Sequence, residues 1–377
     1  MEKKLLYIIG GIAISTIAIL GIVSENLEPI SRTTESNIIE KNEIADSEAV
    51  SSKDKNLIVS EILEKCGRDD ECAYLQIQSI SKTVPQDVVI FIANQIPLEW
   101  EKDNESCHKV AHHMAEFLLG YFNGNLSEAI SHVGNACGNA LYHGVVENYF
   151  SLKMLLEDVE IEELDVISPC MNIGSSIDSN LHQQCVHGLG HSLATIYNFD
   201  VLKAVKRCDE FEDPIDQDRC SDGLFMENNN ENFNNDGGSF DEGDMFYPCN
   251  MVDEKYKFRC YFYQGYYILR LNDYSYKQSF EDCEKISDEE KFTVRCIHAI
   301  SQEMASQYFY NDHEKIVEMC EELNPRYQWE CIRVSSNALT IYIDPQMGVD
   351  LCHLIQEDLL EKCLANWEEV VRQHSTV

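Results

Sequence analysis

Residues 185–194 read CVHGLGHSLA, and a stretch of the same form recurs along the chain. Each copy begins with a cysteine and continues as a run with helical spacing of its apolar residues. Several copies carry glycine or alanine three residues after the cysteine, where a small side chain lets neighbouring helices approach. The other copies are CGNALYHGVVEN (137–148), CSDGLFMEN (220–228), CYFYQGYYIL (260–269) and CIHAISQEMA (296–305). The stretch is therefore interpreted as one unit of a repeated helical scaffold.

The cysteines fall into close pairs, and from Cys170 onward their second members recur every 32 to 40 residues. This is the period of a repeated helical hairpin. The end of one helix and the second turn of the next lie at similar heights in such a hairpin, so two cysteines there can form a disulfide. The predicted pairs are Cys66 with Cys72, Cys170 with Cys185, Cys208 with Cys220, Cys249 with Cys260, Cys283 with Cys296, Cys320 with Cys331, and Cys352 with Cys363. The pairing of Cys107 and Cys137 is left open, and a bridge between adjacent repeats is one option.

Helix start and stop signals agree with this period. HEKIVEMC (313–320) is a short amphipathic segment that ends in the first cysteine of a pair. Asn324-Pro325 offers an N-cap followed by proline at the first helical position, and turns such as Asn272-Asp273 end the longer helices. No stretch alternates as a convincing strand. We predict an all-α fold, a disulfide-stapled α-solenoid of helical hairpins with a period of roughly 35 residues.

The period resembles that of tetratricopeptide and Sel1-like repeats, and GNLSEAI (124–130) resembles their helix joints. The Trp-Leu-Gly-Tyr signature of those families is absent here, and the cysteine staples are foreign to them. The resemblance therefore implies a shared architecture and no shared function.

Acidic residues outnumber basic ones 66 to 29, which gives a formal net charge of -37. Such a surface is repelled by phosphate backbones, so nucleic acid is not expected as a partner. The chain of 377 residues, 44% of them hydrophobic, is large enough to bury a core.

The N-terminus predicts a membrane anchor. Lys3 and Lys4 precede an uncharged run from Leu5 to Val23, which as a helix nearly spans a hydrocarbon core of roughly 30 Å. Val23 is a poor residue before a cleavage site, so we expect an uncleaved anchor with the N-terminus inside. The expected organisation is a short cytoplasmic tail (1–4), a transmembrane signal anchor (5–23), a flexible polar tether (24–53) and an extracytoplasmic helical-repeat domain (54–370).

The cysteine content agrees with that topology. The 16 cysteines are an even number and no two are spaced C-x-x-C, so disulfides in an oxidising compartment are the expectation. Two sequons, at Asn104 and Asn125, are candidates for glycosylation on the outer side.

Histidines gather in one part of the chain, because eight of the 12 lie between residues 108 and 191. The position six residues after the cysteine carries histidine in three successive copies. Equivalent positions on stacked repeats form a ladder with neighbours about 8–10 Å apart, so these imidazoles could converge on zinc or copper. The candidate ligands are His108, His112, His113, His143, His187 and His191. Glu116, Glu147 and Glu227 are candidates for an additional ligand, an orienting carboxylate or a general base.

Two other chemistries are weaker. Residues 190–194 (GHSLA) come within one residue of the nucleophile elbow of α/β-hydrolases, but that elbow follows a strand and this slot is helical. Within the polar insert 228–246, the residues Asn232, Asn234, Asp236 and Gly237 match the start of a calcium loop. Gly243 then stands where the bidentate glutamate is needed, so we interpret the insert as a mobile polar loop and do not expect calcium.

Three functions remain open at this stage. The first is a membrane-anchored scaffold whose concave face binds a protein or peptide partner, with no enzymatic activity. The second is a metal-binding protein or metalloenzyme that uses the histidine cluster. The third is a purely structural surface protein, in which the histidines only pack between helices.

Overall fold

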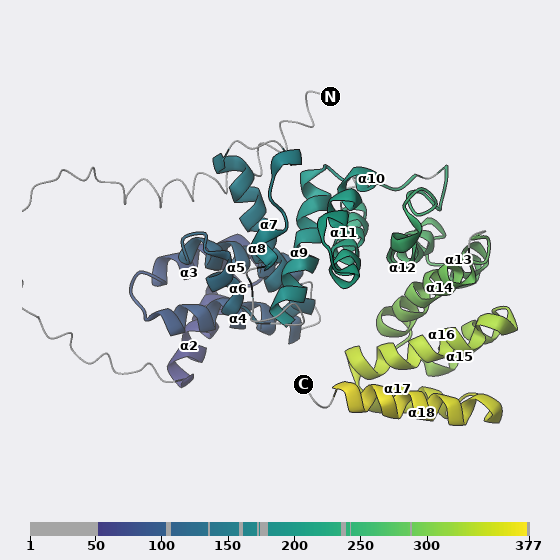
Figure 1. Cartoon of the computed structure of the whole chain (residues 1–377). Coiled ribbons are helices and arrows are strands. Elements are labelled where there is room, and N and C mark those ends of the chain that lie inside the picture. The colour runs from purple at the N-terminus through teal and green to yellow at the C-terminus, as the bar shows by residue number, and fades with distance from the viewer. Residues whose placement is uncertain are drawn as a thin grey trace, which may run out of the picture.

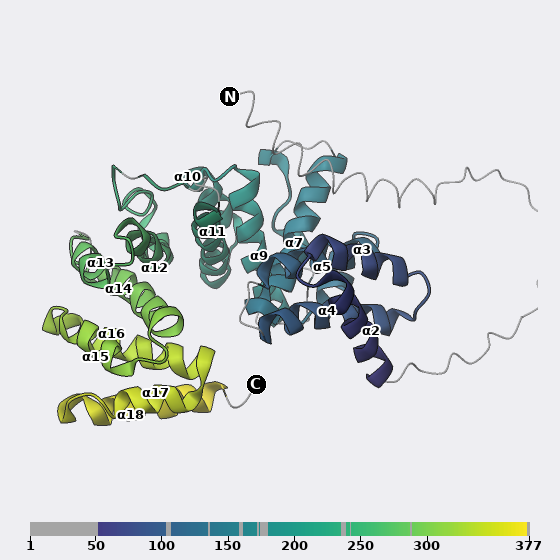
Figure 2. The same cartoon turned by 180° about the vertical axis from the view of Figure 1, so that it is seen from behind.

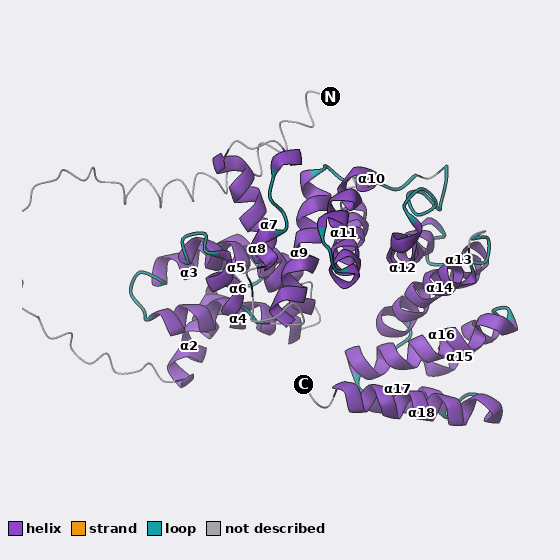
Figure 3. Ribbon diagram, in the orientation of Figure 1, coloured by secondary structure: helices purple, strands orange, loops and turns teal. Residues whose placement is uncertain are grey.

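The computed structural model describes residues 52–102, 107–134, 136–157, 161–171, 173, 180–234, 239–241, 243–286 and 289–374. Over these ranges the protein is all-helical and contains no strand, as predicted (Figure 3). The α-helices are α2 (Ser52–Cys66), α3 (Asp70–Ile80), α4 (Gln86–Lys102), α5 (His108–Tyr121), α6 (Leu126–Ser131), α7 (Ala136–Glu157), α8 (Ser168–Met171), α9 (Asn180–Ile196), α10 (Val201–Ala204), α11 (Pro214–Asn234), α12 (Glu254–Leu271), α13 (Tyr276–Cys283), α14 (Glu290–Glu303), α15 (His313–Glu321), α16 (Pro325–Ala338), α17 (Pro345–Cys352) and α18 (Glu357–His374). The 3-10 helices are η1 (Ile161–Glu163) and η2 (Val205–Glu210), and the π-helices are η3 (Met304–Tyr308) and η4 (Leu339–Ile343).

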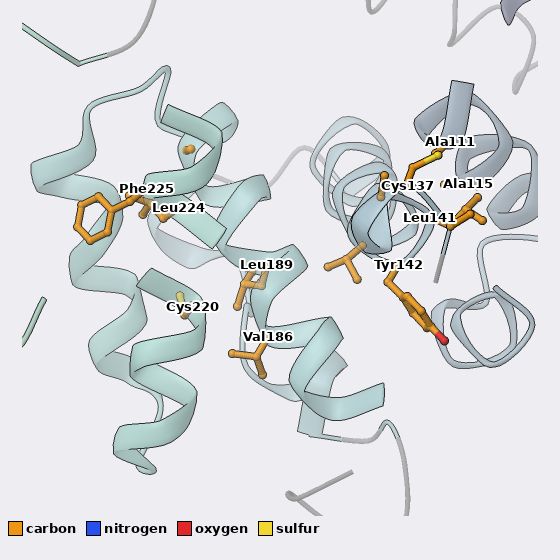
Figure 4. Packing of buried hydrophobic residues seen from close by; sticks show 14 of the residues in the cluster. Ala111, Ala115, Cys137, Leu141, Tyr142, Val186, Leu189, Cys220, Leu224 and Phe225 are labelled. Carbon is orange, nitrogen blue, oxygen red and sulfur yellow. The ribbon is translucent and has the colours of Figure 1, made fainter. Parts of the chain in front are cut away.

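The helices follow one another in chain order along a curved path, which is visible from both sides of the molecule (Figure 1 and Figure 2). Each long helix packs on the next one in the series α5, α7, α9, α11, α12, α14, α16 and α18. The core lies between these successive helices. Figure 4 shows Val186 and Leu189 of α9, with Leu224 of α11 on one side and Leu141 of α7 on the other.

Local signals determine where the helices begin and end, as the sequence predicts. Asn324 accepts a hydrogen bond from the backbone N–H of Arg326 at 3.2 Å, and Pro325 is the first residue of α16. At the other end of a long helix, α12 stops at Leu271 and the chain turns through Asp273, whose φ is 47°. Asparagine and aspartate tolerate that left-handed backbone better than most residues.

Eight disulfides link the 16 cysteines, and all seven predicted pairs are confirmed. The confirmed bridges join Cys66 to Cys72, Cys170 to Cys185, Cys208 to Cys220, Cys249 to Cys260, Cys283 to Cys296, Cys320 to Cys331, and Cys352 to Cys363. The Cα–Cα distances of all eight bridges, between 5.4 and 5.7 Å, lie in the normal range.

The pairing that the sequence leaves open is also resolved, because Cys107 bonds to Cys137. This eighth bridge joins the start of α5 to the start of α7 and spans 30 residues, so it closes no short hairpin.

Some expectations fall outside the part of the chain that the structure describes. The predicted anchor at 5–23 and the sequon at Asn104 are among them. Within the described ranges, no helix combines the length and the apolar character that a membrane span requires. Asn125 is described, and its side chain caps α6 by accepting a hydrogen bond from the backbone N–H of Glu128 at 3.2 Å.

Part of the polar insert 228–246 has defined contacts. Its first residues continue helix α11 as far as Asn234. Asn228 is buried and accepts a hydrogen bond from the backbone N–H of Ser239 at 2.7 Å, and the ring of Phe240 stacks on Tyr267 of α12 at 4.1 Å. These contacts hold the described part of the insert against α12.

The local disulfides lead to the first prediction. Replacing both Cys320 and Cys331 with alanine should lower the free energy of unfolding by about 3 kcal/mol, because the bridge restricts a short loop of the unfolded chain. Urea unfolding followed by circular dichroism measures the change. Peptide mapping of the parent without reduction should return the link between Cys320 and Cys331, and a double variant as stable as the parent would contradict the assignment.

A hydrogen-bonded carboxylate between α14 and α16 leads to the second prediction. His298 Nε2 lies 2.8 Å from Glu330 Oε2, and Arg333 lies 2.6 Å from the same oxygen. The hydrogen bond from His298, followed by the one from Arg333, lowers the pKa of Glu330 from 4.5 to about 2. A carboxyl group whose pKa is lower in the folded than in the unfolded protein stabilises the fold at pH values above its unfolded pKa. For Glu330 this stability is lost as the pH falls from 4.5 towards 2.

The variant Glu330→Gln should therefore be less stable than the parent at pH 7, by about 1–2 kcal/mol after solvent screening. The difference should shrink as the pH falls below 4.5. Urea unfolding at a series of pH values measures it. Glu318→Gln on α15, whose carboxylate pairs with the exposed Lys315 of the same helix, serves as the control and should change little. A Glu330→Gln deficit that stays constant down to pH 2 would refute the linkage.

Candidate metal centre

Five histidines from three successive long helices come together in the first half of the molecule. Both α5 and α9 carry two histidines spaced by four residues, which places each pair on one helix face. They form two groups, in each of which the candidate ligand atoms lie within 4.8 Å of one another. We call them the α5–α7 triad (His108, His112 and His143) and the α7–α9 triad (His143, His187 and His191). His143 belongs to both.

The ring nitrogens of the α7–α9 triad have the spacing of ligands around one ion. His191 Nε2 lies 3.1 Å from His143 Nδ1 and 3.1 Å from His187 Nε2. Ligands of a tetrahedral zinc ion with metal–nitrogen bonds of about 2.0–2.1 Å are roughly 3.3 Å apart. The triad therefore needs little rearrangement to bind a metal.

Three carboxylates lie behind the outward-facing nitrogens of these rings. Glu227 Oε2 of α11 is 2.7 Å from His191 Nδ1, and Glu147 Oε2 of α7 is 3.1 Å from His112 Nδ1. Asp222 Oδ2 of α11 is 3.5 Å from the Nδ1 of His187. A carboxylate in this position favours the tautomer with the proton on Nδ1, which leaves a lone pair on Nε2 for a metal.

This tautomer bears on what lies between the Nε2 atoms of His187 and His191. Both Nδ1 atoms face carboxylates, so both Nε2 atoms present lone pairs to each other across 3.1 Å. A direct hydrogen bond between them requires either a doubly protonated ring or the other neutral tautomer of His187, whose Nδ1 lone pair would then face Asp222. A metal ion that accepts both lone pairs satisfies the arrangement without either change.

Of the buried side-chain nitrogens in the described part of the chain that find no hydrogen-bond partner, two belong to the triads. They are the Nε2 atoms of His112 and His143. A buried polar atom without a partner costs about 1–3 kcal/mol, so native proteins rarely retain one without a reason. Coordination to a metal would provide that reason for both atoms.

The surroundings keep most of these imidazoles neutral, which is the form that binds metals. Burial and the neighbouring His112 lower the pKa of His108 to about 3. Burial and the neighbouring histidines also hold the pKa values of His143 and His191 well below 6.5. His112 differs, because burial opposes its protonation but Glu147 raises its pKa.

The surroundings shift the pKa values of two of these carboxylates in opposite directions. Burial raises the pKa of Glu227. Burial acts in the same direction on Asp222, but the hydrogen bond from His187 and the charge of Arg259 outweigh it and lower that pKa. Arg259 of α12 lies 3.2 Å from Asp222 Oδ1. Asp222 therefore remains ionised and links the cluster to the second half of the chain.

Two predicted residues lie elsewhere. His113 Nδ1 is 3.3 Å from Asp70 of α3, and Glu116 lies near Tyr74, whose pKa burial and this carboxylate raise to about 12. Neither residue belongs to a triad of the described chain. Cys107 stands just before α5 and closes no hairpin. The sixth residue after Cys107 therefore lies at a different height on its helix than the sixth residue after Cys185, which lies inside α9.

Sequence reasoning missed Asp222. The signal that could have found it is the position two residues after the hairpin cysteine, which is His187 on α9 and Asp222 on α11. The same position carries His298 on α14 and Arg333 on α16, which approach to 3.2 Å. Residues at this position therefore contact each other on neighbouring helices, as the histidine ladder was expected to do.

The calcium hypothesis gains no support. Asn232 and Asn234 lie in helix α11, not in a loop. Asp236 and Gly237 are outside the described residues. In the remaining described ranges, the two histidine triads are the groups spaced for a metal ion.

Comparison of the chain with protein-family models, with curated proteins and with solved structures gives no match. The class of protein is therefore defined by its own residues. It is an all-helical, disulfide-bonded protein with a buried cluster of histidines and carboxylates.

Close contact between α9 and α11 places Asp222 and Glu227 beside His187 and His191, and it leads to the third prediction. A Cβ at Gly223 would overlap the carbonyl oxygen of His187, and a Cβ at Gly190 would overlap that of Cys220. Gly223→Ala should therefore lower the free energy of unfolding by at least about 2 kcal/mol, because the two backbones must separate.

Gly120→Ala on α5 is the matched control, because a Cβ there meets nothing within 4 Å. It should leave stability unchanged or raise it slightly, since alanine favours a helix. Denaturant unfolding compares the two variants. Equal stability of the two variants would show that the α9–α11 contact tolerates a side chain.

Proposed function

We propose that this protein binds a transition-metal ion at the α7–α9 triad. The observation that carries the proposal is that His191 Nε2 lies 3.1 Å from both His143 Nδ1 and His187 Nε2, with carboxylates behind His187 and His191. This favours the metal-binding function among the three that the sequence leaves open.

The donor atoms limit the choice of ion. The ligands are imidazoles, and all 16 cysteines are consumed in disulfides, so no thiolate takes part. Imidazole-rich sites suit zinc and copper(II), whereas calcium and magnesium prefer oxygen ligands. Three protein ligands leave a fourth position for water or another small ligand, as in reactive zinc sites.

Burial supports a tightly held ion that remains accessible from one side. His143 and His191 are buried, but the side chains of His112 and His187 are 22% and 17% exposed. An ion can therefore enter past the rings of His112 and His187. The disulfides of the surrounding helices restrict their movement, as a preorganised site requires.

We also propose a solenoid architecture and a location on the outer face of a membrane. The series of packed hairpins is a solenoid in the sense of the predicted repeat, and the anchor predicted at 5–23 holds it on the outer face of a membrane. The eight disulfides support an oxidising compartment.

A second candidate function, binding of a protein or peptide partner, is favoured by one surface. Large apolar side chains are exposed around the π-helices η3 and η4, which contact each other. The most exposed is Tyr342, at 60%, followed by Tyr308 at 44%. Exposed aromatic groups of this kind are frequent in protein interfaces.

The fourth prediction tests metal binding. The full chain, dialysed against zinc or copper(II) and then against buffer, should retain at least one ion per chain by elemental analysis. The double variant His187→Ala, His191→Ala should lose the ion of the α7–α9 triad, because two of its three ligands are absent. Its helical circular dichroism should persist, because the disulfides and most of the core are unchanged.

The control removes the same number of imidazoles from the exposed end of the chain, with His353→Ala and His374→Ala. It should bind as much metal as the parent. A parent protein with metal only at background level would overturn the proposal. Loss of helix in the double variant, with no metal in the parent, would assign these histidines to packing.

A further inference from the structure

We infer that the two triads together form a dinuclear centre in which the imidazole ring of His143 bridges two metal ions. This inference rests on the proposed function, because it adds a second ion at the α5–α7 triad. The observation behind it is that His143 is the histidine shared by both groups of the described chain.

The two nitrogens of the His143 ring have different surroundings. Nδ1 faces the α7–α9 triad, at 3.1 Å from His191 Nε2. Nε2 lies on the far side of the ring and is buried, with no hydrogen-bond partner in the described chain. The His143 ring also packs against both histidines of α5, with centroid distances of 5.0 Å to His108 and 5.1 Å to His112. Nε2 is therefore the nitrogen available to the α5–α7 triad.

A single ion leaves this ring unsatisfied. If His143 binds one ion through Nδ1, the neutral ring carries its proton on Nε2, and this N–H is buried without an acceptor. A second ion removes the problem. It takes the Nε2 lone pair, the ring proton passes to solvent, and the ring becomes an imidazolate that binds one ion through each nitrogen.

The α5–α7 triad has its own features of a ligand set. His112 Nε2 is also buried without a hydrogen-bond partner in the described ranges, and Glu147 Oε2 lies 3.1 Å from the opposite nitrogen of that ring. The ring of His108 lies tilted beside that of His112, with centroids 4.6 Å apart. This triad therefore repeats the pattern of a carboxylate, an imidazole and a free lone pair that the α7–α9 triad shows.

The charges of the site match two ions. Two divalent cations bring four positive charges. The carboxylates of Glu147, Asp222 and Glu227 bring three negative charges, and the bridging imidazolate of His143 brings the fourth. The positive charge of Arg259, which also contacts Asp222, is balanced by its ion pair with Asp218. In a buried site this balance matters, because an uncompensated charge is costly there. With bonds of about 2.0–2.1 Å on either side of the ring, the two ions would be roughly 6 Å apart.

The fifth prediction uses copper(II) on the full chain. The parent should bind two copper ions per chain, and its electron paramagnetic resonance signal should be almost absent at low temperature, because an imidazolate couples the two unpaired electrons. His112→Ala should bind one copper ion and show the full signal of one isolated spin. His108→Ala tests the same triad without removing the partner of Glu147, and should behave in the same way.

His113→Ala is the matched control, because this histidine neighbours His112 on α5 but pairs with Asp70 outside both triads. It should bind two coupled ions, as the parent does. One ion per chain in the parent, unaffected by His112→Ala, would overturn the dinuclear centre and leave the proposed function intact. Two ions with a full two-spin signal would overturn the bridge. A parent that binds no metal would refute the proposed function as well.

Discussion

The disulfide that closes each hairpin is the constraint on which the rest of the structure depends. It fixes the height at which the end of one helix meets the second turn of the next, with Cα–Cα distances that vary by only a few tenths of an ångström. Because the height is the same in each hairpin, positions counted from the second cysteine fall at equivalent places on successive helices. Contacts between His187 and Asp222, and between His298 and Arg333, follow from this common register.

The common register also explains how much could be predicted from the sequence. Cysteine pairing and helix ends depend on residues close together in the chain, so the seven local bridges and the cap at Asn324 were accessible. His143 and His191 were found because each lies six residues after a cysteine, and His187 because it lies one helical turn before His191. His113, six residues after Cys107, lies outside both triads of the described chain and pairs with Asp70. Asp222 was missed although it occupies the same position after Cys220 as His187 does after Cys185. The division into two triads depends on the angles between helices, which no local pattern encodes.

The histidine cluster combines features that oppose each other in the absence of a ligand. Burial keeps the imidazoles neutral, while the carboxylates around them favour positive charge. Neutral rings whose Nδ1 atoms face carboxylates turn their lone pairs inward, towards one another. The backbone contact at Gly190 and Gly223 holds α11, with Asp222 and Glu227, tightly against α9. A cation in the centre, as proposed, would resolve this conflict.

The short spacing of the bridged cysteines has a consequence for how the chain acquires its bonds. Seven of the eight bridges join cysteines 6 to 15 residues apart, and the eighth spans 30 residues. Sixteen thiols could pair in very many ways, but short loops close at the lowest entropic cost. From Cys170 onward, the correct partner is always the next cysteine to emerge during synthesis. This part of the chain can therefore oxidise hairpin by hairpin, with little need for an isomerase to correct long-range errors.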